Sequence, residues 1–267
     1  MTRILTSLVA IPILIYVVMF APLGICISVI LVAMLVALSE YFVFTEAKGP
    51  GSYSWLGYAL ASLILLSFYF KQSHIEMLFP VFSAVVLIVA LFSRKDITKA
   101  LEATAFTLFG AWYLGGLMGF LVGVRMIGSG GEMGSDLLMM LLVIVWAGDT
   151  FAYAFGKWIG KHSLASVSPN KTWEGAIAGF VFSIIGAIAC RYIFIQQLSI
   201  EHAAILGALI GVTGQLGDLC ESLLKRSVQM KDSGSILPGH GGMLDRIDGL
   251  LFGAPTIYYY FYFFLRS

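Results

Sequence analysis

Residues 22–45 read PLGICISVILVAMLVALSEYFVFT, an apolar stretch in which Glu40 is the only charged residue. A helix of about 20 apolar residues crosses the hydrocarbon core of a bilayer, so this stretch predicts a transmembrane helix. The composition extends that prediction to the whole chain: 59% of the 267 residues are hydrophobic and 12% are charged, whereas soluble domains average about 45–50% and about 25%. A soluble globular protein, a disordered chain and a collagen-like chain are therefore excluded.

Nine apolar stretches of this kind lie along the chain, separated by short polar breaks. They predict an all-α fold, namely a polytopic integral membrane protein with about nine transmembrane helices. The stretches are residues 4–20, 22–45, 54–70, 76–93, 103–127, 136–156, 174–195, 202–224 and 249–266. Pro22 opens the second stretch directly after the first, without the small-residue cleavage site of a signal peptide, so we expect the first stretch to be retained.

The distribution of Lys and Arg predicts the orientation. With nine spans, twelve of the 16 Lys and Arg residues fall on one side of the membrane and four on the other. The positive-inside rule then favours an amino terminus inside, a carboxyl terminus outside, and loops near 157–173 and 225–248 in the cytoplasm. If the first two stretches were a single span, every later loop would change sides.

The net charge and the cysteines argue against three features: a nucleic-acid partner, a disulfide framework and a zinc site. The net charge of +1 gives no reason to expect nucleic acid. Cys26, Cys190 and Cys220 lie in apolar stretches without a Cys-x-x-Cys spacing, so neither a disulfide framework nor a zinc site is predicted.

The densest charge lies between residues 218 and 248, where nine of 31 residues are charged. The chain runs from this segment into apolar stretches on both sides. Charged side chains at membrane depth cost at least about 2.5–3.5 kcal/mol each, so they are rare and commonly functional. We therefore expect residues 128–267 to form the catalytic region, and residues 1–127 to act as a scaffold and as the contact in a homodimer.

Two pairs of acids in this segment suit a divalent cation. Asp218 and Glu221 are three residues apart and Ser222 follows, so the three side chains share one face of a helix. Asp245 and Asp248 form a second acidic face at the start of the last apolar stretch. Oxygen ligands of this kind bind Mg²⁺, which keeps some water for a phosphate to replace. The plain alternative is that these acids only form ion pairs with the basic residues nearby.

The linker between the two acidic faces suits phosphate. Gly241 and Gly242 follow His240, and Lys231 and Arg246 flank them. Glycines that bare consecutive amides beside cationic side chains make an anion-binding concavity. His240 is expected to donate to phosphate or to act in proton transfer. A plain turn remains the alternative for the glycines alone.

A second polar block lies between residues 146 and 175. Asp149 is an ionisable residue in an otherwise apolar helix, which needs a partner or a water-filled cavity. Ser168 followed by Pro169 is typical of a helix N-cap with proline at the first helical position, so we expect the seventh helix to begin there. An anion binds at such an end, and Lys171 would strengthen it. The alternative for Lys171 is an ordinary positive-inside lysine beside a capped helix.

The run SLLKRSVQMKDSGSILPGHGGMLDRID at residues 222–248 resembles the signature of the phosphatidate cytidylyltransferases, also called CDP-diacylglycerol synthases. The likeness keeps a fixed spacing over 27 residues, which makes it highly specific. The block from Asp149 to Gly175 is similar to the cytoplasmic loop of that family. The amino-terminal third carries no motif that matches.

The resemblance implies a reaction and its partners. CTP and phosphatidic acid are joined to give CDP-diacylglycerol and pyrophosphate, with Mg²⁺ required. Membrane lipid is then a further partner, and the bacterial inner membrane, with the active site facing the cytoplasm, is the expected location. The lipid phosphate is itself a nucleophile near neutral pH, so positioning and charge neutralisation carry the reaction without a covalent intermediate. A second metal ion would screen both the entering and the leaving oxygens.

With that reaction in view, each candidate residue has an expected role. The metal ligands are expected to be Asp218 and Asp245, supported by Asp248 and Ser222. Charge on the attacked phosphoryl group and on pyrophosphate is expected to be stabilised by four basic residues, Lys225, Arg226, Lys231 and Arg246. Contacts to the substrates are expected from Asp149, Lys171, Ser222, His240, Gly241 and Gly242.

Two other functions remain open. A transporter or channel would also place acids in the membrane, but it has no use for the cytoplasmic lysines and the glycine loop. A CDP-alcohol phosphotransferase also uses paired aspartates. Its Asp-Gly-x-x-Ala-Arg pattern and four-residue aspartate spacing are missing here, because Asp245 and Asp248 are three residues apart.

Overall fold

The computed structural model describes residues 2–49, 51–70, 75–93, 96–128, 132–231, 233–234 and 241–266. The helices are α1 (Thr2–Met19), α2 (Leu23–Lys48), α3 (Ser54–Tyr69), α4 (Ile75–Phe92), α5 (Ala100–Gly110), α6 (Leu117–Arg125), α7 (Glu132–Ile159), α8 (Trp173–Ile193), α9 (Ile200–Ser227) and α10 (Leu244–Tyr260). Shorter helical segments are η1 (Ile97–Lys99), η2 (Ala111–Gly116) and η3 (Phe261–Leu265). Two strands, β1 (Ser163–Ala165) and β2 (Ser168–Thr172), pair as an antiparallel hairpin.

The all-α prediction is confirmed, apart from this small hairpin. Each of the nine predicted stretches overlaps a helix. Within the described residues, five helical segments are long and apolar enough to cross a membrane: Leu23–Lys48, Ile97–Arg125, Glu132–Ile159, Trp173–Ile193 and Ile200–Ser227. Shorter apolar helical segments are Leu8–Met19, Ser54–Tyr69 and Phe79–Phe92. The chain is therefore built as an integral membrane protein, and the count of nine spans stays a prediction.

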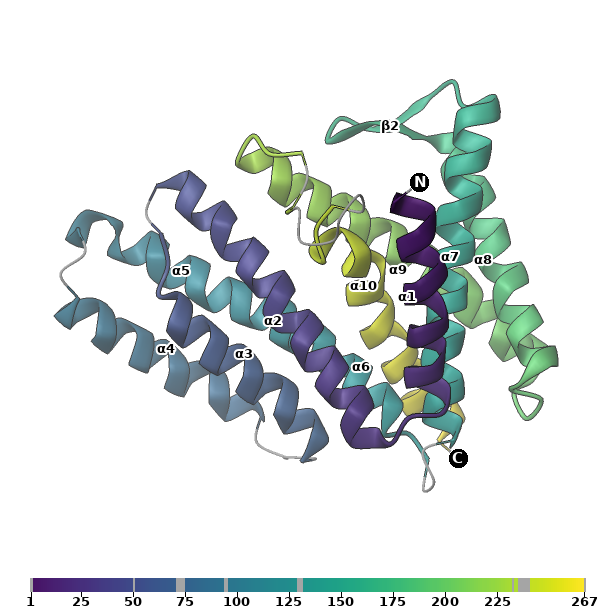
Figure 1. Cartoon of the computed structure of the whole chain (residues 1–267), viewed down its shortest axis with the longest axis horizontal. Helices are drawn as coiled ribbons and strands as arrows, with labels where there is room; N and C mark the ends of the chain where they lie inside the picture. The colour runs from purple at the N-terminus through teal and green to yellow at the C-terminus, as the bar shows by residue number, and fades with distance from the viewer. Residues whose placement is uncertain are drawn as a thin grey trace.

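The helices form two groups that share one core (Figure 1). α3, α4 and α5 lie on one side of the molecule and α7, α8 and α9 on the other, with α2, α6 and α10 between them. α7 packs against α8, α8 against α9, and α9 against α10, which also contacts α6. One cluster of buried side chains includes Met34 of α2, Met118 of α6, Leu206 of α9 and Leu251 of α10. Both halves of the chain therefore fold around the same core.

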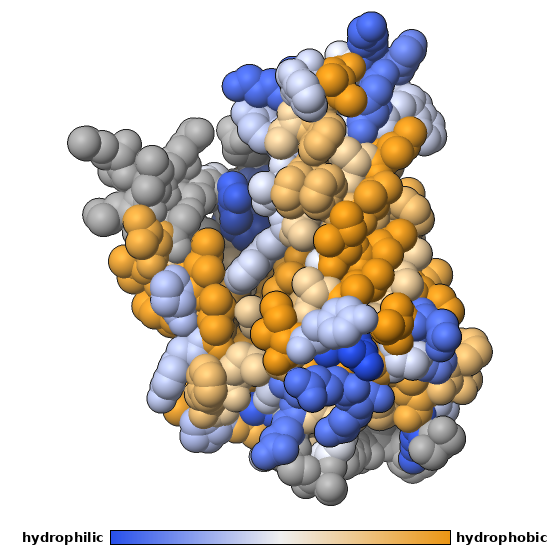
Figure 2. Space-filling view, turned by 90° about the vertical axis from the view of Figure 1, so that its right-hand side faces the viewer, coloured by the Kyte–Doolittle hydropathy of each residue, from blue (hydrophilic) through white to orange (hydrophobic). Residues whose placement is uncertain are grey.

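The outer faces of α8 and α9 are apolar. α8 exposes Ile177, Val181 and Ile185 at a spacing of four residues, and α9 exposes Leu209 and Leu216. Figure 2 shows apolar residues in a band between polar residues at the two ends of the molecule. Soluble monomers rarely expose apolar surface on this scale, so the band suits hydrocarbon.

Several polar segments meet at one end of the molecule, the upper end in Figure 1. The end of α2 contacts the end of α9, because Lys48 Nζ donates to Ser227 O at 3.0 Å. The end of α9 contacts the hairpin, because Arg226 Nε donates to Val167 O at 3.4 Å. The start of α10 lies at the same end (Figure 1). Loops that the Lys and Arg distribution assigns to one side of the membrane are thus neighbours in the structure.

The start of α8 corrects the prediction for Ser168. Residues Ser168–Thr172 are extended and pair with β1. The helix begins at Trp173, and its N-cap is Thr172, whose hydroxyl accepts a hydrogen bond from Gly175 N at 3.2 Å. Pro169 suits a short strand of a two-stranded hairpin, where a missing backbone donor is tolerated. The prediction that the seventh helix begins at Ser168–Pro169 was therefore wrong.

Candidate active site

α9 and α10 approach each other closely at glycines. Gly214 lies opposite Gly249, and a Cβ on Gly214 would meet Gly249 O at 3.6 Å. A Cβ on Gly217 would collide with the carbonyl oxygen of Asp248. Because these positions lack side chains, the two helix backbones come close enough for acids on both to meet.

Three carboxylates meet at this contact. Asp218 and Glu221 of α9 and Asp248 of α10 each offer an oxygen, and the three atoms lie within 4.8 Å of one another. Glu221 is fully buried, whereas 29% of the Asp218 side chain is exposed. Carboxylate oxygens at this spacing are donors that suit Mg²⁺. The group contains two of the predicted metal ligands, Asp218 and Asp248, together with Glu221, which was predicted to share the face of Asp218.

Lys225 neutralises part of this negative charge. Its Nζ lies 2.5 Å from Glu221 Oε2 and 2.5 Å from Asp245 Oδ1, and 12% of its side chain is exposed. Asp248 accepts a hydrogen bond from Gly249 N at 2.7 Å and forms no ion pair with a described residue. The ion pairs proposed as the plain alternative are thus present, and they leave Asp248 without a cationic partner in the described part of the chain.

Asp245 lies outside the group of three and holds Ser233 and Gly242, two described residues that precede α10. Its Oδ2 accepts hydrogen bonds from Ser233 N at 3.2 Å, Ser233 Oγ at 2.9 Å and Gly242 N at 3.0 Å. Its Oδ1 faces Lys225. Both carboxylate oxygens are therefore engaged by protein donors. The sequence predicts that Asp245 joins Asp218 and Asp248 as a metal ligand, but the structure does not place Asp245 in that group.

The hairpin brings Lys171 to the carboxylates. Lys171 Nζ forms an ion pair with Asp218 Oδ2. Glu174, in the first turn of α8, holds the start of the hairpin, because its Oε2 accepts hydrogen bonds from Lys161 N at 3.1 Å and His162 N at 3.3 Å. Its Oε1 lies 2.6 Å from His162 Nδ1. The loop predicted to be cytoplasmic therefore places the Lys171 ammonium group beside Asp218 of α9.

Asp149 and Arg246 belong to the same group of charges. The Asp149 carboxylate interacts electrostatically with Asp218, Lys171 and Arg246, and Asp149 and Arg246 are both exposed. Acids and bases thus come together from α7, β2, α9 and α10. We call this group the acidic site; its members are Asp149, Lys171, Asp218, Glu221, Lys225, Arg246 and Asp248.

Two predicted basic residues, Arg226 and Lys231, are not members of the acidic site. Arg226 Nη1 donates to Met230 O at 3.2 Å and its Nε donates to Val167 O, so Arg226 joins the end of α9 to the hairpin. Lys231 is exposed. Neither residue forms an ion pair with an acid in the described part of the chain. Ser222, the predicted supporting ligand on α9, is half-buried.

The glycines of the predicted phosphate loop lie directly before α10. Gly241 has a φ of 77°, a left-handed conformation that glycine adopts without a steric penalty. Gly242 leaves no room for a side chain, since a Cβ there would collide with Ser233 and Glu40. His240 lies outside the described residues, so its role in binding phosphate stays a prediction.

Sequence reasoning missed two residues that reach this region from the N-terminal half. Glu40 of α2 contacts the start of α10. Tyr113 comes from the π-helical segment η2, and its buried hydroxyl has no hydrogen-bond partner among the described residues. Tyr113 interacts electrostatically with Glu221 and Asp248, and π-helical turns are frequent at functional sites. The sequence signal that could have identified Glu40 is its position as the only charged residue in the apolar stretch at residues 22–45.

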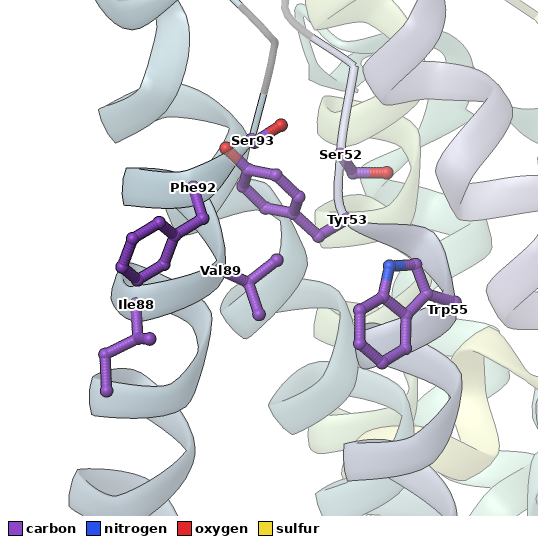
Figure 3. A pocket seen from close by; sticks show the side chains of 7 residues that line it. All are labelled: Ser52, Tyr53, Trp55, Ile88, Val89, Phe92 and Ser93. Carbon is purple, nitrogen blue, oxygen red and sulfur yellow. The ribbon is translucent and has the colours of Figure 1, made fainter.

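A cavity of about 380 Å³ lies in the N-terminal half, between the start of α3 and the end of α4. Figure 3 shows the Tyr53 ring reaching across it toward Ser93 and Val89, with Trp55 below. Its described lining residues are aromatic, aliphatic and serine side chains. The acids and lysines of the predicted catalytic region lie instead around α9 and α10, so the acidic site is the candidate for chemistry.

These features define a class of protein. The chain is a helical membrane protein with apolar outer faces, and its cluster of carboxylates and cations suits phosphate chemistry. The chain belongs to the cytidylyltransferase family, which it matches over residues 1–264. The resemblance drawn from residues 222–248 is therefore confirmed. The match also extends into the amino-terminal third, where no motif was found.

Relatives from three bacterial genera carry the same name. The chain is 34% identical over 257 residues to the phosphatidate cytidylyltransferase of Synechocystis sp., covering 87% of each chain. It is 32% identical over 264 residues to that of Bacillus subtilis, covering 96% of each chain. It is 39% identical over 187 residues to that of Staphylococcus aureus, covering 70% of this chain and 67% of the relative.

Proposed function

We propose that this chain joins CTP and phosphatidate to give CDP-diacylglycerol and pyrophosphate, a step of phospholipid biosynthesis. A phosphate oxygen of phosphatidate forms a bond to the α-phosphorus of CTP, and the bond from that phosphorus to the oxygen bridging to the β-phosphorus breaks. The family and the names of the relatives support this reaction. The observation that carries it is the meeting of carboxylates and lysines from separate elements at one end of an apolar helical bundle.

The residues of the acidic site fit Mg²⁺, which we propose as the cofactor. Asp218, Glu221 and Asp248 supply oxygens within 4.8 Å of one another. Neither oxygen of buried Glu221 has a hydrogen-bond partner among the described residues, although one forms the ion pair with Lys225. When bound, Mg²⁺ would supply positive charge against the phosphates and orient them. A second metal ion and a ligand role for Asp245 stay predictions.

The basic residues of the acidic site neutralise phosphate charge. A phosphate monoester has its second pKa at about 6, so the lipid phosphate is already charged at neutral pH and no general base is needed. Lys171 and Arg246 are accessible from the surface, where CTP and the lipid headgroup arrive. Lys225 lies deeper, between two carboxylates. Fixed cations of this kind stabilise the negative charge that develops on the departing pyrophosphate.

We further propose that the site faces the cytoplasm at the inner membrane of a bacterium. The bacterial relatives, the Lys and Arg distribution and the meeting of the polar segments at one end support this placement. The headgroup then reaches the acidic site while the acyl chains stay beside apolar helix faces such as those of α8 and α9. Dimer formation through residues 1–127 stays a prediction, which the mass of the protein in detergent tests.

Turnover by the purified protein tests this function. Given CTP, phosphatidate and Mg²⁺ in detergent, it is expected to release pyrophosphate and form the CDP-lipid, and EDTA is expected to stop the reaction. A CDP-alcohol phosphotransferase would instead consume CDP-diacylglycerol, and a transporter would move ions across liposomes without turnover. Either of these results, with no pyrophosphate released, would contradict the proposal.

Lys171→Ala is expected to weaken substrate binding. Loss of one charge-assisted contact from a half-exposed side chain should raise KM for CTP or for phosphatidate about tenfold, with a smaller change in kcat. Initial rates measured while one substrate is varied at a time give both constants. Lys157→Ala, which removes an exposed lysine at the end of α7, is the matched control. Unchanged KM values for both substrates would rule out the binding role of Lys171.

A further inference from the structure

The start of α10 has no capping side chain of its own. Its N-cap is Met243, whose side chain accepts no hydrogen bond from the first turn. The first amides of a helix have no partner within the helix, and burying them unpaired is costly. The first turn of α10 therefore needs an acceptor from another part of the chain.

Glu40 supplies that acceptor. Its Oε1 accepts a hydrogen bond from Met243 N at 2.8 Å, and its Oε2 accepts one from Leu244 N at 2.9 Å. Only 3% of Glu40 is exposed. A carboxylate is also favoured at a helix N-terminus by the helix dipole. A residue of α2 thus fixes the helix that carries Asp245 and Asp248.

Glu40 also reaches Asp245 through one intermediate. The single hydroxyl proton of Ser233 is shared between Glu40 Oε2, 3.1 Å from Ser233 Oγ, and Asp245 Oδ2, 2.9 Å from it. Asp245 in turn faces Lys225. Ser233 is itself 4% exposed. A buried chain of polar contacts therefore runs from Glu40 of α2 to Lys225 of the acidic site.

The packing around the Glu40 carboxylate is tight. A Cβ on Gly234 would lie 2.8 Å from Glu40 Oε1, and a Cβ on Gly242 would collide with Ser233 and Glu40. The loop can approach Glu40 this closely because both positions are glycine. The described residues Gly234 and Gly242, the first turn of α10 and Glu40 therefore fix one another's positions.

We propose that Glu40 is a positioning residue, which holds the first turn of α10 and, through Ser233, the Asp245 carboxylate in the arrangement that cytidylyl transfer needs. The inference rests on the proposed function, and it gives residues 1–127 a part in the site beyond that of a scaffold. Glu40 touches no member of the acidic site directly. It acts through the loop and the helix that it holds.

Glu40→Gln tests this role with little change in shape. The amide keeps one acceptor oxygen, but its NH₂ group faces a backbone donor, so at least one of the two amide contacts is lost. We expect kcat to fall about tenfold, as loss of one charge-assisted hydrogen bond predicts, with KM for CTP within about twofold of normal. Glu40→Ala removes the carboxylate and is expected to lower kcat. Glu40→Asp keeps the charge, so it is expected to retain part of the kcat that Glu40→Ala loses. Glu46→Gln changes an exposed acid of the same helix and serves as the control.

Amide hydrogen exchange of the peptide that contains Met243 and Leu244 gives a readout independent of turnover. Exchange without substrate is expected to be about tenfold faster in Glu40→Gln and unchanged in Glu46→Gln. Unchanged exchange, or faster exchange with normal kcat, would overturn the positioning role. If the wild-type protein showed no cytidylyl transfer, the proposed function would fail, and the exchange result would still decide whether Glu40 holds α10.

Discussion

Asp218→Asn is expected to lower kcat more than about 100-fold, because losing even an indirect partner of a metal ligand typically costs about 10–100-fold. The substitution removes the charge of one carboxylate in the group of three and the partner of Lys171. The side chain is 29% exposed, so the folded protein should keep near-normal stability. Pyrophosphate release across a range of Mg²⁺ concentrations measures the loss and any shift in the Mg²⁺ midpoint.

Glu201→Gln gives the matched control for this experiment. Glu201 is an exposed acid in the first turn of α9, at the other end of the helix from Asp218. Its substitution is expected to leave both the rate and the Mg²⁺ midpoint unchanged. If Asp218→Asn kept a near-normal rate at low Mg²⁺, the carboxylate group would not be the metal site.

Asp245→Asn is expected to lower both activity and stability. The carboxylate receives three hydrogen bonds at Oδ2 and faces Lys225 at Oδ1, and an amide cannot serve both sets of donors. We expect turnover to fall about 100-fold and the free energy of unfolding to fall by about 1–3 kcal/mol, the cost of leaving a buried donor unsatisfied. Pyrophosphate release and unfolding in detergent measure the two effects.

The contrast with Asp218→Asn separates two roles for Asp245. If Asp245 organises the loop, its substitution lowers stability and leaves the Mg²⁺ midpoint close to normal. If it is a primary metal ligand, as the sequence predicts, the midpoint moves to higher Mg²⁺ while stability stays unchanged. A double-mutant cycle with Lys225→Met adds a second check, because residues that act as a pair give non-additive losses.

The helices could be predicted from the sequence because long apolar stretches leave the chain few alternatives. The stretch at residues 22–45 lies within α2 except for Pro22, the N-cap residue, and the stretch at residues 202–224 lies within α9. The start of α8 could not be placed in the same way. Ser168–Pro169 matches a helix start locally, but pairing with β1 holds these residues extended and leaves the cap to Thr172.

The acids of the site could be predicted only in part. Helical spacing places Asp218 and Glu221 on one face, which the structure bears out. Asp245 and Asp248 also share a face, so spacing alone cannot decide which of them joins the carboxylates of Asp218 and Glu221. That depends on the close contact at Gly217 and on the contacts of Asp245 with Ser233 and Gly242.

Glu40 shows a different limit of sequence reasoning. Its hydrogen-bond partners lie about two hundred residues away in the chain, and no local pattern connects them. The sequence marks Glu40 as an unusual charge in an apolar stretch, but only the packing of α2 beside α10 identifies what that charge contacts.

The glycine contact between α9 and α10 has a consequence for the surrounding bilayer. With no layer of side chains between the two backbones near Gly214 and Gly249, the spacing of the helices does not depend on rotamers. Transmembrane helices adjust to thinner or thicker bilayers largely by tilting. If α10 crosses the bilayer, as α9 is long and apolar enough to do, the two helices lean as one rigid body. A cell that remodels its lipids with temperature would then keep the spacing of the carboxylates on α9 and α10.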